Sequence, residues 1–278
     1  MAPDCVTRGS YAAQVRAIQY TYSDTVGVAA IISDQFNRCE ERLTMNIAKA
    51  RVLVTGGSSG IGKATALALA EAGARVAICG RDRAAVEQAA SEIDAAPFVA
   101  DVSRESDVVA LIPAVIKALG GYDVLINNAG FGRFGPLVDT TADDMRAVWE
   151  TNVLGATLVA RETAKHFIAQ ATGNIINVAS TSGSHGGVDA SAYSSSKFAL
   201  TSLTECWRAE LRKHNIRVMQ INPSEVLTDF AHRARGAERV DDPSKLHGSD
   251  IAAAITTMLA LDDRAMVTEM TVWATNPK

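Results

Sequence analysis

The feature that most constrains the fold is an alternation of short β-type runs with helical stretches, which begins at Arg51. The first run, 51–55, is apolar and rich in β-branched residues, as is typical of a strand buried on both faces. Strand–helix alternation with two-sided burial predicts an α/β domain, built on a doubly wound parallel sheet of about seven strands flanked by helices. The further strands are expected at 75–80, 98–100, 124–126, 174–178, 217–221 and 269–273.

Helices are expected between these strands, and several carry their own start or stop signals. Gly73 is placed to end the first helix, because glycine readily adopts the backbone conformation that follows a helix. Asp82 is a typical N-cap, and Thr141 with Asp144 resembles a capping box at the start of a long helix. The expected helices are 60–72, 82–93, 105–119, 141–170, 193–213 and 249–261.

The sequence changes character near Met45. Before this point the charges are mixed and the apolar residues show only weak helical order. We therefore interpret residues 1–44 as an N-terminal extension outside the fold, either a loosely attached helix pair or upstream sequence if the natural start is Met45. Its acidic residues argue against a transit peptide. Residues 45–278 show no second break, which predicts one domain.

Composition excludes several classes of function. The 278 residues include 27 Lys and Arg and 31 Asp and Glu, so the net charge is −4 with both signs scattered. A nucleic-acid or membrane-surface binder needs a basic patch instead. No apolar run approaches the ~20 residues of a membrane span. The four cysteines and five histidines show no disulfide or metal-ligand spacing, so we expect no metal and a cytoplasmic location.

A glycine-rich turn lies directly between the first strand and its helix, with the sequence Thr55-Gly-Gly-Ser-Ser-Gly-Ile-Gly62. Gly56 can adopt a turn conformation that other residues avoid. Gly60 lets the backbone approach a pyrophosphate, and Gly62 lets the helix pack closely. The helix N-terminus then offers N–H groups and partial positive charge to phosphate. The turn therefore predicts a dinucleotide site.

The end of the second expected strand bears on which dinucleotide binds. An NAD site usually places Asp or Glu there to accept the ribose 2′-hydroxyl. Here Gly80 occupies that position and Arg81 follows, which favours a 2′-phosphate and hence NADP(H) over NAD(H). Asp101, after the third strand, is expected either to contact the adenine amino group or to cap a helix together with Ser103.

Tyr193 and Lys197 are four residues apart on an expected helix and so share one face. A free tyrosine titrates near pH ~10 and is a poor acid–base group at neutral pH. A nearby ammonium favours the phenolate and lowers the tyrosine pKa. The pair is therefore a candidate for proton transfer, although such a spacing also occurs by chance on helix surfaces.

Taken together, these motifs resemble the short-chain dehydrogenase/reductase family over residues 45–278, with a Rossmann-type fold. Ser180 lies thirteen residues before Tyr193, as is usual in that family. Members assigned as 3-oxoacyl-[acyl-carrier-protein] reductases look most similar. The motifs that carry the resemblance are the glycine turn, Asn127-Asn-Ala-Gly130, Asn152, Ser180, Tyr193-Ser-Ser-Ser-Lys197 and Asn222-Pro-Ser-Glu-Val-Leu-Thr228.

The resemblance implies a role for each matching residue. Tyr193 would exchange a proton with the substrate oxygen, Ser180 would hydrogen-bond that oxygen, and Lys197 would bind the nicotinamide ribose and tune Tyr193. Asn152 would hold a water through its backbone carbonyl. The expected cofactor-binding residues are Gly56, Ser58, Ser59, Gly60, Ile61, Gly62, Arg81, Asp101, Val102, Asn128, Ala129, Gly130, Tyr193, Lys197, Pro223, Val226 and Thr228.

The expected function is NADPH-dependent interconversion of a ketone and a secondary alcohol, with a 3-oxoacyl thioester of fatty acid metabolism as one substrate. A dehydrogenase for alcohols, sugars or steroids is an alternative, and a silent NADP(H)-binding regulator is another. Residues 229–248, with Arg233, Arg235, Arg239 and Lys245, are expected to form a lid that steers acidic acyl carriers. The family also implies a homotetramer or dimer.

Two departures from the family pattern stand near the C-terminus. Ser224 follows Pro223 where glycine is usual, so a positive φ there would strain the backbone. The segment 269–273 lacks the glycine pair that often follows the last strand, which leaves the expected subunit interface open.

Overall fold

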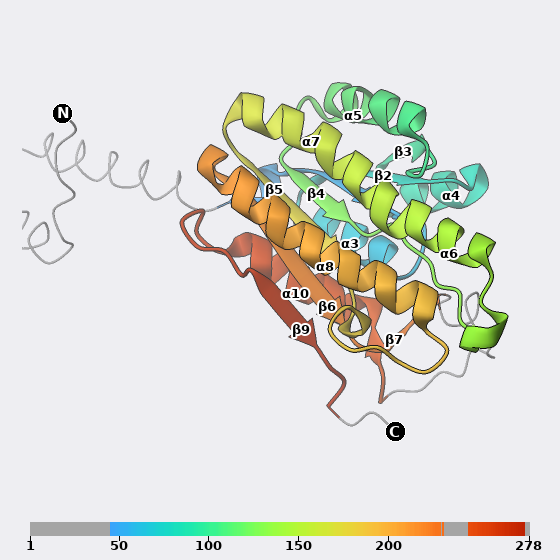
Figure 1. The fold of residues 1–278 in the computed structure, drawn as a ribbon. Helices are drawn as coiled ribbons and strands as arrows, with labels where there is room; N and C mark the ends of the chain where they lie inside the picture. The colour runs from blue at the N-terminus through green and yellow to red at the C-terminus, as the bar shows by residue number, and fades with distance from the viewer. Residues whose placement is uncertain (1–44, 229, 231–243, 276–278) are drawn as a thin grey trace, which may run out of the picture. The chain divides into compact units, whose positions relative to one another are not determined.

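A seven-stranded parallel sheet with helices on both faces organises the computed structural model, which describes residues 45–228, 230 and 244–275 (Figure 1). Its spatial order is β3-β2-β1-β4-β5-β6-β9, so the chain starts centrally, runs to one edge and returns to the other side. This confirms the predicted fold class. The strands are β1 Arg51–Thr55, β2 Arg75–Gly80, β3 Ala96–Val99, β4 Val124–Asn127, β5 Gly173–Val178, β6 Ile216–Pro223 and β9 Glu269–Val272.

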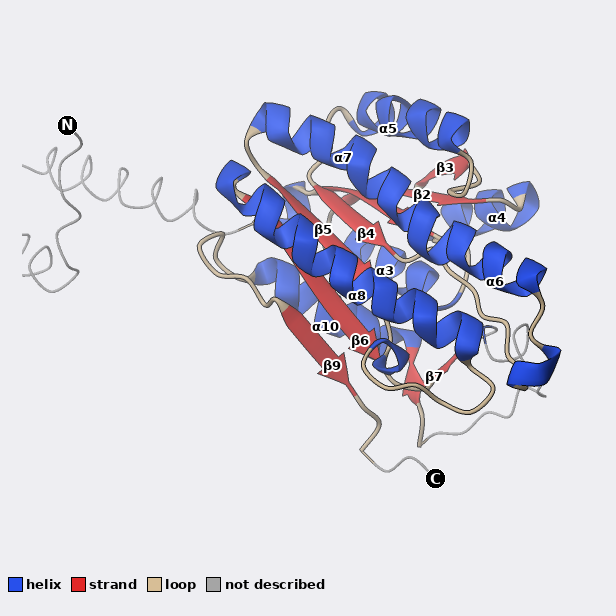
Figure 2. Ribbon diagram, viewed as in Figure 1, coloured by secondary structure: helices blue, strands red, loops and turns tan. Residues whose placement is uncertain are grey.

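The helices form two layers, one on each face of the sheet (Figure 2). Alternate residues of each strand enter opposite cores: Val52 and Val54 pack with α3, α4 and α10, whereas Leu53 packs with α5 and α7. Such two-sided burial explains the apolar runs in the sequence. The helices are α3 Gly60–Glu71, α4 Arg83–Ile93, α5 Glu105–Leu119, α6 Ala142–Trp149, α7 Ala156–Gln170, α8 Ser191–Leu211 and α10 Gly248–Ala260.

The sequence-based element boundaries agree with the structure to within about two residues, and three differences are informative. The third strand is Ala96–Val99 and contains Pro97, which an edge strand tolerates because one side of its ladder is unpaired. The long helix expected from Thr141 is interrupted by a π-helical segment, Glu150–Gly155. A short parallel pair, β7 Val226–Leu227 and β8 Leu246–His247, was not expected.

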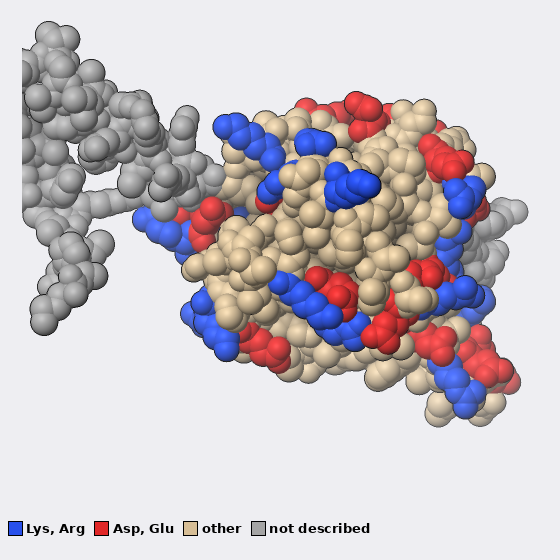
Figure 3. Space-filling model, turned by 90° about the horizontal axis from the view of Figure 1, so that it is seen from above, with Lys and Arg blue, Asp and Glu red and all other residues tan. Residues whose placement is uncertain are grey.

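The predictions for residues 1–44 and for Arg233, Arg235 and Arg239 lie outside the described residues. Within the described part, no helix combines the length and apolar character that crossing a membrane requires. Positive and negative side chains are interspersed on the face shown in Figure 3, as the scattered charges of the sequence suggest.

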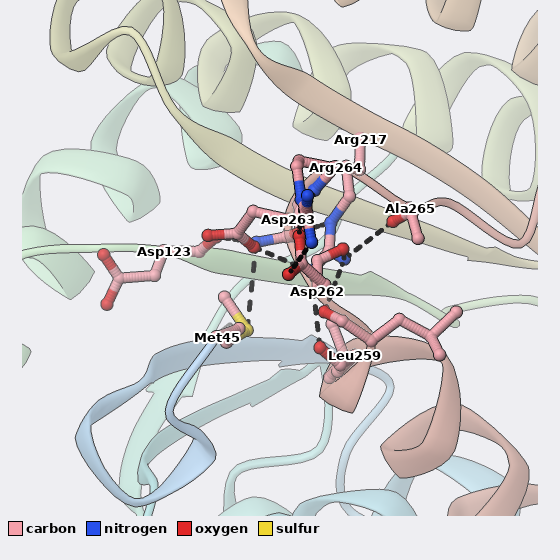
Figure 4. A network of polar contacts seen from close by, with 10 residues as sticks. Met45, Asp123, Arg217, Leu259, Asp262, Asp263, Arg264 and Ala265 are labelled. Atoms are coloured by element: carbon pink, nitrogen blue, oxygen red, sulfur yellow. Dashed lines mark hydrogen bonds and ion pairs between the residues drawn. The ribbon is translucent and has the colours of Figure 1, made fainter. Parts of the chain in front are cut away.

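Arg217 of β6 anchors the connection between α10 and β9 at the end of the sheet where β6 begins (Figure 4). Its side chain is 7% exposed. The guanidinium donates to Asn174 Oδ1 at 2.6 Å and to the carbonyls of Leu261 and Ala265, both at 3.1 Å, and pairs with Asp263 at 3.4 Å. Burial lowers the pKa of Arg217, and the nearby carboxylates oppose this effect. One buried cation thus satisfies carbonyls that follow the helix end.

We expect Arg217→Met to lower the free energy of unfolding by about 3 kcal/mol, because it leaves buried acceptors without a donor. Chemical unfolding in urea measures this change. The matched control is Arg83→Met, since the Arg83 side chain is 71% exposed and pairs only with Glu87 on its own helix among the contacts described. Equal stability of the two variants would contradict the anchoring role.

Candidate active site

A cavity of about 950 Å³ opens at the carboxyl ends of the central strands. Residues that follow β1, β4 and β5 line it, among them Gly56, Asn128 and Ser180. The strand order reverses between β1 and β4, so the chain diverges to both sides at this point. Open α/β sheets commonly bind ligands at such a reversal.

The cavity gathers nearly all the residues that the sequence predicted for the site. Gly62 and Asn152 lie outside its lining, although both touch residues that form it. The predicted residues that line it are Gly56, Ser58, Ser59, Gly60, Ile61, Arg81, Asp101, Val102, Asn128, Ala129, Gly130, Ser180, Tyr193, Lys197, Pro223, Val226 and Thr228.

The glycine-rich turn is held in shape by contacts to the end of β4. Gly56 and Gly60 have positive φ values of 64° and 55°, which glycine adopts without strain. Asn128 Nδ2 donates to the carbonyls of Thr55 at 2.9 Å and Gly56 at 3.2 Å. A Cβ on Gly62 would lie 2.3 Å from the Gly56 oxygen. Gly62 is therefore required for packing within the turn, while the other two glycines shape its backbone.

The N-terminus of α3 fits a phosphate group. Ser59 is its N-cap with extended backbone, and no side chain in the described structure caps the helix by a hydrogen bond. Ser59, Gly60 and Ile61 line the cavity, and the first turn contains no acidic residue. Such a helix end attracts anions through its N–H groups and its dipole. These features suit the pyrophosphate of a dinucleotide.

The part of the cavity beside the end of β2 combines a glycine, a cation and an anion. Gly80 ends β2, and exposed Arg81 follows it in the lining. Asp101 accepts bonds from the backbone N–H of Ser103 at 3.0 Å and from its hydroxyl at 2.7 Å. Burial alone would raise the pKa of Asp101, but the bonds from Ser103 and the charges of Arg81 and Arg104 lower it. Asp101 thus holds Ser103 and also faces the cavity.

Tyr193 and Lys197 lie one turn apart on α8 and both line the cavity. Lys197 Nζ donates to the Val178 carbonyl at 2.9 Å and lies 5.7 Å from the centre of the Tyr193 ring. The lysine is 6% exposed, and its burial lowers its pKa to about 8. A pKa near 8 leaves the ammonium mostly protonated at neutral pH, so it can favour the tyrosine phenolate.

Ser180 lies two residues after the end of β5 and is the N-cap of a short 3-10 turn, Thr181–Gly183. Its Oγ accepts a hydrogen bond from the backbone N–H of Ser182 at 3.1 Å. This contact uses a lone pair of the hydroxyl and leaves its O–H as a donor to a molecule in the cavity. Ser180 can therefore hydrogen-bond a carbonyl oxygen.

Asn152 lies outside the cavity lining, within the π-helical segment. Asn152 is 1% exposed. Its side chain forms two hydrogen bonds with the backbone of Phe131: Oδ1 accepts from the N–H at 3.0 Å, and Nδ2 donates to the carbonyl at 2.9 Å. Nδ2 also donates to Ser196 Oγ at 3.0 Å. Asn152 thereby joins the loop after β4 to α8. Its expected water-binding role stays a prediction.

Sequence reasoning missed the aromatic part of the lining, which consists of Phe131, Phe134, Phe230 and Trp273. The available signal was the segment Phe131-Gly-Arg-Phe134, since aromatic residues make up only 5% of the chain. Two other residues bear on the site. His185 is exposed and lies outside the cavity lining. Lys245, expected in a basic lid, pairs with Glu225 at 2.7 Å.

Ser224 occupies the position where the family usually has glycine. It is not among the described residues with positive φ, and its N–H donates to the Val272 carbonyl at 2.9 Å. The loop therefore adopts a conformation that serine accepts, and the strain considered from the sequence does not arise.

Comparisons with known proteins agree with this geometry. A family model described as short chain dehydrogenase matches residues 50–239. The uncharacterized oxidoreductase YxnA of Bacillus subtilis is 36% identical over 191 residues, and dehydrogenase/reductase SDR family member 7B of Bos taurus is 31% identical over 208. These alignments cover 66% and 71% of this chain, but only 54% and 64% of the two relatives.

Among solved structures, a 3-ketoacyl-(acyl-carrier-protein) reductase from Brucella melitensis complexed with NADH is similar, with a TM-score of 0.72 and 29% identity. The match covers 81% of this chain and 96% of that one. The resemblance inferred from the motifs is thus confirmed, and the chain belongs to the short chain dehydrogenase family of oxidoreductases.

Proposed function

We propose that this protein is an NADPH-dependent oxidoreductase that interconverts a ketone and a secondary alcohol. The observation that carries the proposal is that one cavity holds both the glycine turn and the Tyr193–Lys197 pair. A phosphate-binding turn alone suits many nucleotide proteins, and a tyrosine–lysine pair alone suits an ordinary helix surface. Their shared cavity supports acid–base chemistry beside a bound dinucleotide.

Three side chains have separate roles in the chemistry at the substrate oxygen. When bound, a nicotinamide cofactor supplies the hydride that the carbonyl carbon accepts. Tyr193 gives its phenolic proton to the carbonyl oxygen, so that C=O becomes an alcohol. Ser180 donates a hydrogen bond to the same oxygen and stabilises the charge that develops there. The Lys197 ammonium makes the tyrosine a stronger acid.

Arg81 and Gly80 support the preference for NADP(H). Arg81 lines the cavity, and Gly80 places no carboxylate where a 2′-phosphate would sit. An arginine fork suits phosphate, and a carboxylate there would repel it. A Cβ on Gly80 would lie 3.4 Å from Ser58 Oγ and 3.0 Å from Val86 Cγ2, so glycine also keeps this corner open.

The further expectations remain proposals that rest on the family. They are a 3-oxoacyl thioester substrate, a place in fatty acid metabolism, a cytoplasmic location and assembly as a homotetramer or dimer. The silent regulator is less well supported, because Ser180, Tyr193 and Lys197 all line the cavity and Asn152 braces it.

Tyr193→Phe tests the proposed function. We expect kcat for NADPH-dependent ketone reduction to fall by about 10³-fold, because general acid catalysis contributes roughly 10²–10⁴. The Kd of NADPH, measured by its fluorescence, should change by less than about threefold, because the ring remains. Retained turnover would exclude Tyr193 as the acid. A wild-type protein that binds NADPH but reduces no ketone would favour the regulator.

The buried lysine predicts a pH dependence. Lys197 carries its proton below its pKa of about 8 and loses it above that value. Reduction consumes a proton and needs the ammonium beside Tyr193, so kcat/KM for ketone reduction should fall as pH rises through about 8. A profile measured at constant ionic strength checks this. A rate that stays level until about pH 10 would show that Lys197 does not set the activity.

Arg81→Gln tests cofactor preference. Charge-assisted hydrogen bonds contribute ~1.5–3 kcal/mol, so the ratio of kcat/KM for NADPH over NADH should fall by about tenfold or more. Adding Gly80→Asp should lower the ratio further. The control is Arg83→Gln, two residues along and outside the cavity lining. If Arg81→Gln and the control give the same ratio, Arg81 does not read the 2′-phosphate.

A further inference from the structure

The ring of Tyr193 contacts two phenylalanine rings that come from distant parts of the chain. Phe134, in the loop after β4, and Phe230, after β7, each lie 5.4 Å from the Tyr193 ring, centre to centre. The ring planes are tilted by 44° and 55°. Both phenylalanines are half-buried and line the cavity. A substrate whose carbonyl reaches the Tyr193 hydroxyl would therefore have these rings close to its carbon skeleton.

Gly132 allows the two phenylalanines to converge. A Cβ on this buried glycine would lie 2.6 Å from Phe134 Cε2 and 3.1 Å from Phe230 Cζ. A side chain here would push at least one ring from its place. The loop backbone that carries Phe134 is in turn held through Asn152, which binds the neighbouring Phe131 at both backbone groups. The arrangement of the rings is therefore built into the fold.

The charged residues at this end of the cavity are already engaged. Arg133 pairs with Asp144 at 3.5 Å and lies 5.8 Å over the Phe131 ring. Glu225 pairs with Lys245 at 2.7 Å. Among the described residues, the lining around Tyr193 thus combines two aromatic rings and two paired charges with Lys197 and the hydroxyl groups near Ser180. Aromatic faces favour flat apolar groups, which also suit pockets that contain few polar groups.

We propose that Phe134 and Phe230 form a substrate subsite for a flat, uncharged ring next to the reacting carbonyl. The substrate would then be an aryl or cyclic ketone, or the matching alcohol, and this proposal replaces the 3-oxoacyl thioester that the family suggests. This inference rests on the proposed function for its chemistry, because Tyr193 must act on the carbonyl. The reaction stays as written above: the carbonyl carbon gains a hydride, and its oxygen gains the tyrosine proton.

The first experiment compares ketones with equal numbers of carbon atoms. Acetophenone is paired with 2-octanone, cyclohexanone is paired with 2-hexanone, and acetoacetyl-coenzyme A represents the thioesters. With the full-length protein and NADPH, we expect kcat/KM to favour acetophenone over 2-octanone by about tenfold, as an aromatic contact of ~1.5 kcal/mol predicts. The preference for cyclohexanone over 2-hexanone should be smaller, because its ring is saturated and not flat. Equal or better turnover of the straight-chain ketones or of the thioester would overturn the subsite.

The second experiment separates binding from turnover. Ligand-observed NMR titrations of acetophenone and 2-octanone, with NADP⁺ present, measure affinity without chemistry. Ring preference in binding without turnover of any ketone would support the subsite and refute the proposed function. Turnover of ketones without any ring preference would have the opposite meaning.

Two variants locate the preference in the aromatic pair. Phe134→Leu keeps an apolar side chain but removes the ring, and should reduce the ratio of kcat/KM for acetophenone over 2-octanone by about tenfold. Gly132→Ala keeps Phe134 but displaces it, and should reduce the same preference. The control is Phe98→Leu, a half-buried phenylalanine of β3 outside the cavity lining. Thermal unfolding checks that each variant is folded. An equal loss of kcat/KM for both ketones would show that Phe134 only packs in the site and does not select the ring.

Discussion

The site depends on the hydrogen bonds that join the ends of β1 and β4. Thr55 Oγ1 accepts from the backbone N–H groups of Asn128 at 2.9 Å and Ala129 at 3.0 Å, while the Asn128 side chain donates back to the carbonyl of Thr55. These bonds fix two strands at the point where the chain departs to opposite edges of the sheet. The bonds also satisfy the backbone N–H groups of Asn128 and Ala129, which line the cavity.

Lys197 is a charged side chain that the same scaffold keeps buried at a cost in free energy. Burial of an ammonium is unfavourable, and the lowered pKa of Lys197 expresses this cost. Its Nζ keeps a hydrogen bond to the Val178 carbonyl, at the end of β5. The sheet and α8 therefore hold the Lys197 ammonium in a buried position beside Tyr193, although an ammonium is more stable in water. Functional sites commonly retain such groups at the expense of stability.

Much of the fold and of the candidate site could be predicted from the sequence because their signals are local. The strand at 51–55 carries apolar residues on both faces, so this short segment by itself indicates that the strand is buried on both sides. The positive φ of Gly56 and Gly60 follows from a turn that few other residues form. Tyr193 and Lys197 share a helix face through spacing alone. Where a local signal was weak, as in the edge strand with Pro97, the observed strand begins earlier than the predicted one.

Other features were decided only by the tertiary structure, since they join residues far apart in the chain. No periodicity reveals that Phe134 and Phe230 meet at Tyr193, or that Asn152 holds the backbone of Phe131. The sequence by itself determined the order of strands and helices, the glycine-rich turn and the tyrosine–lysine pair. The tertiary structure decided which side chains surround that pair, because only the packing of separate loops places their rings and charges in one cavity.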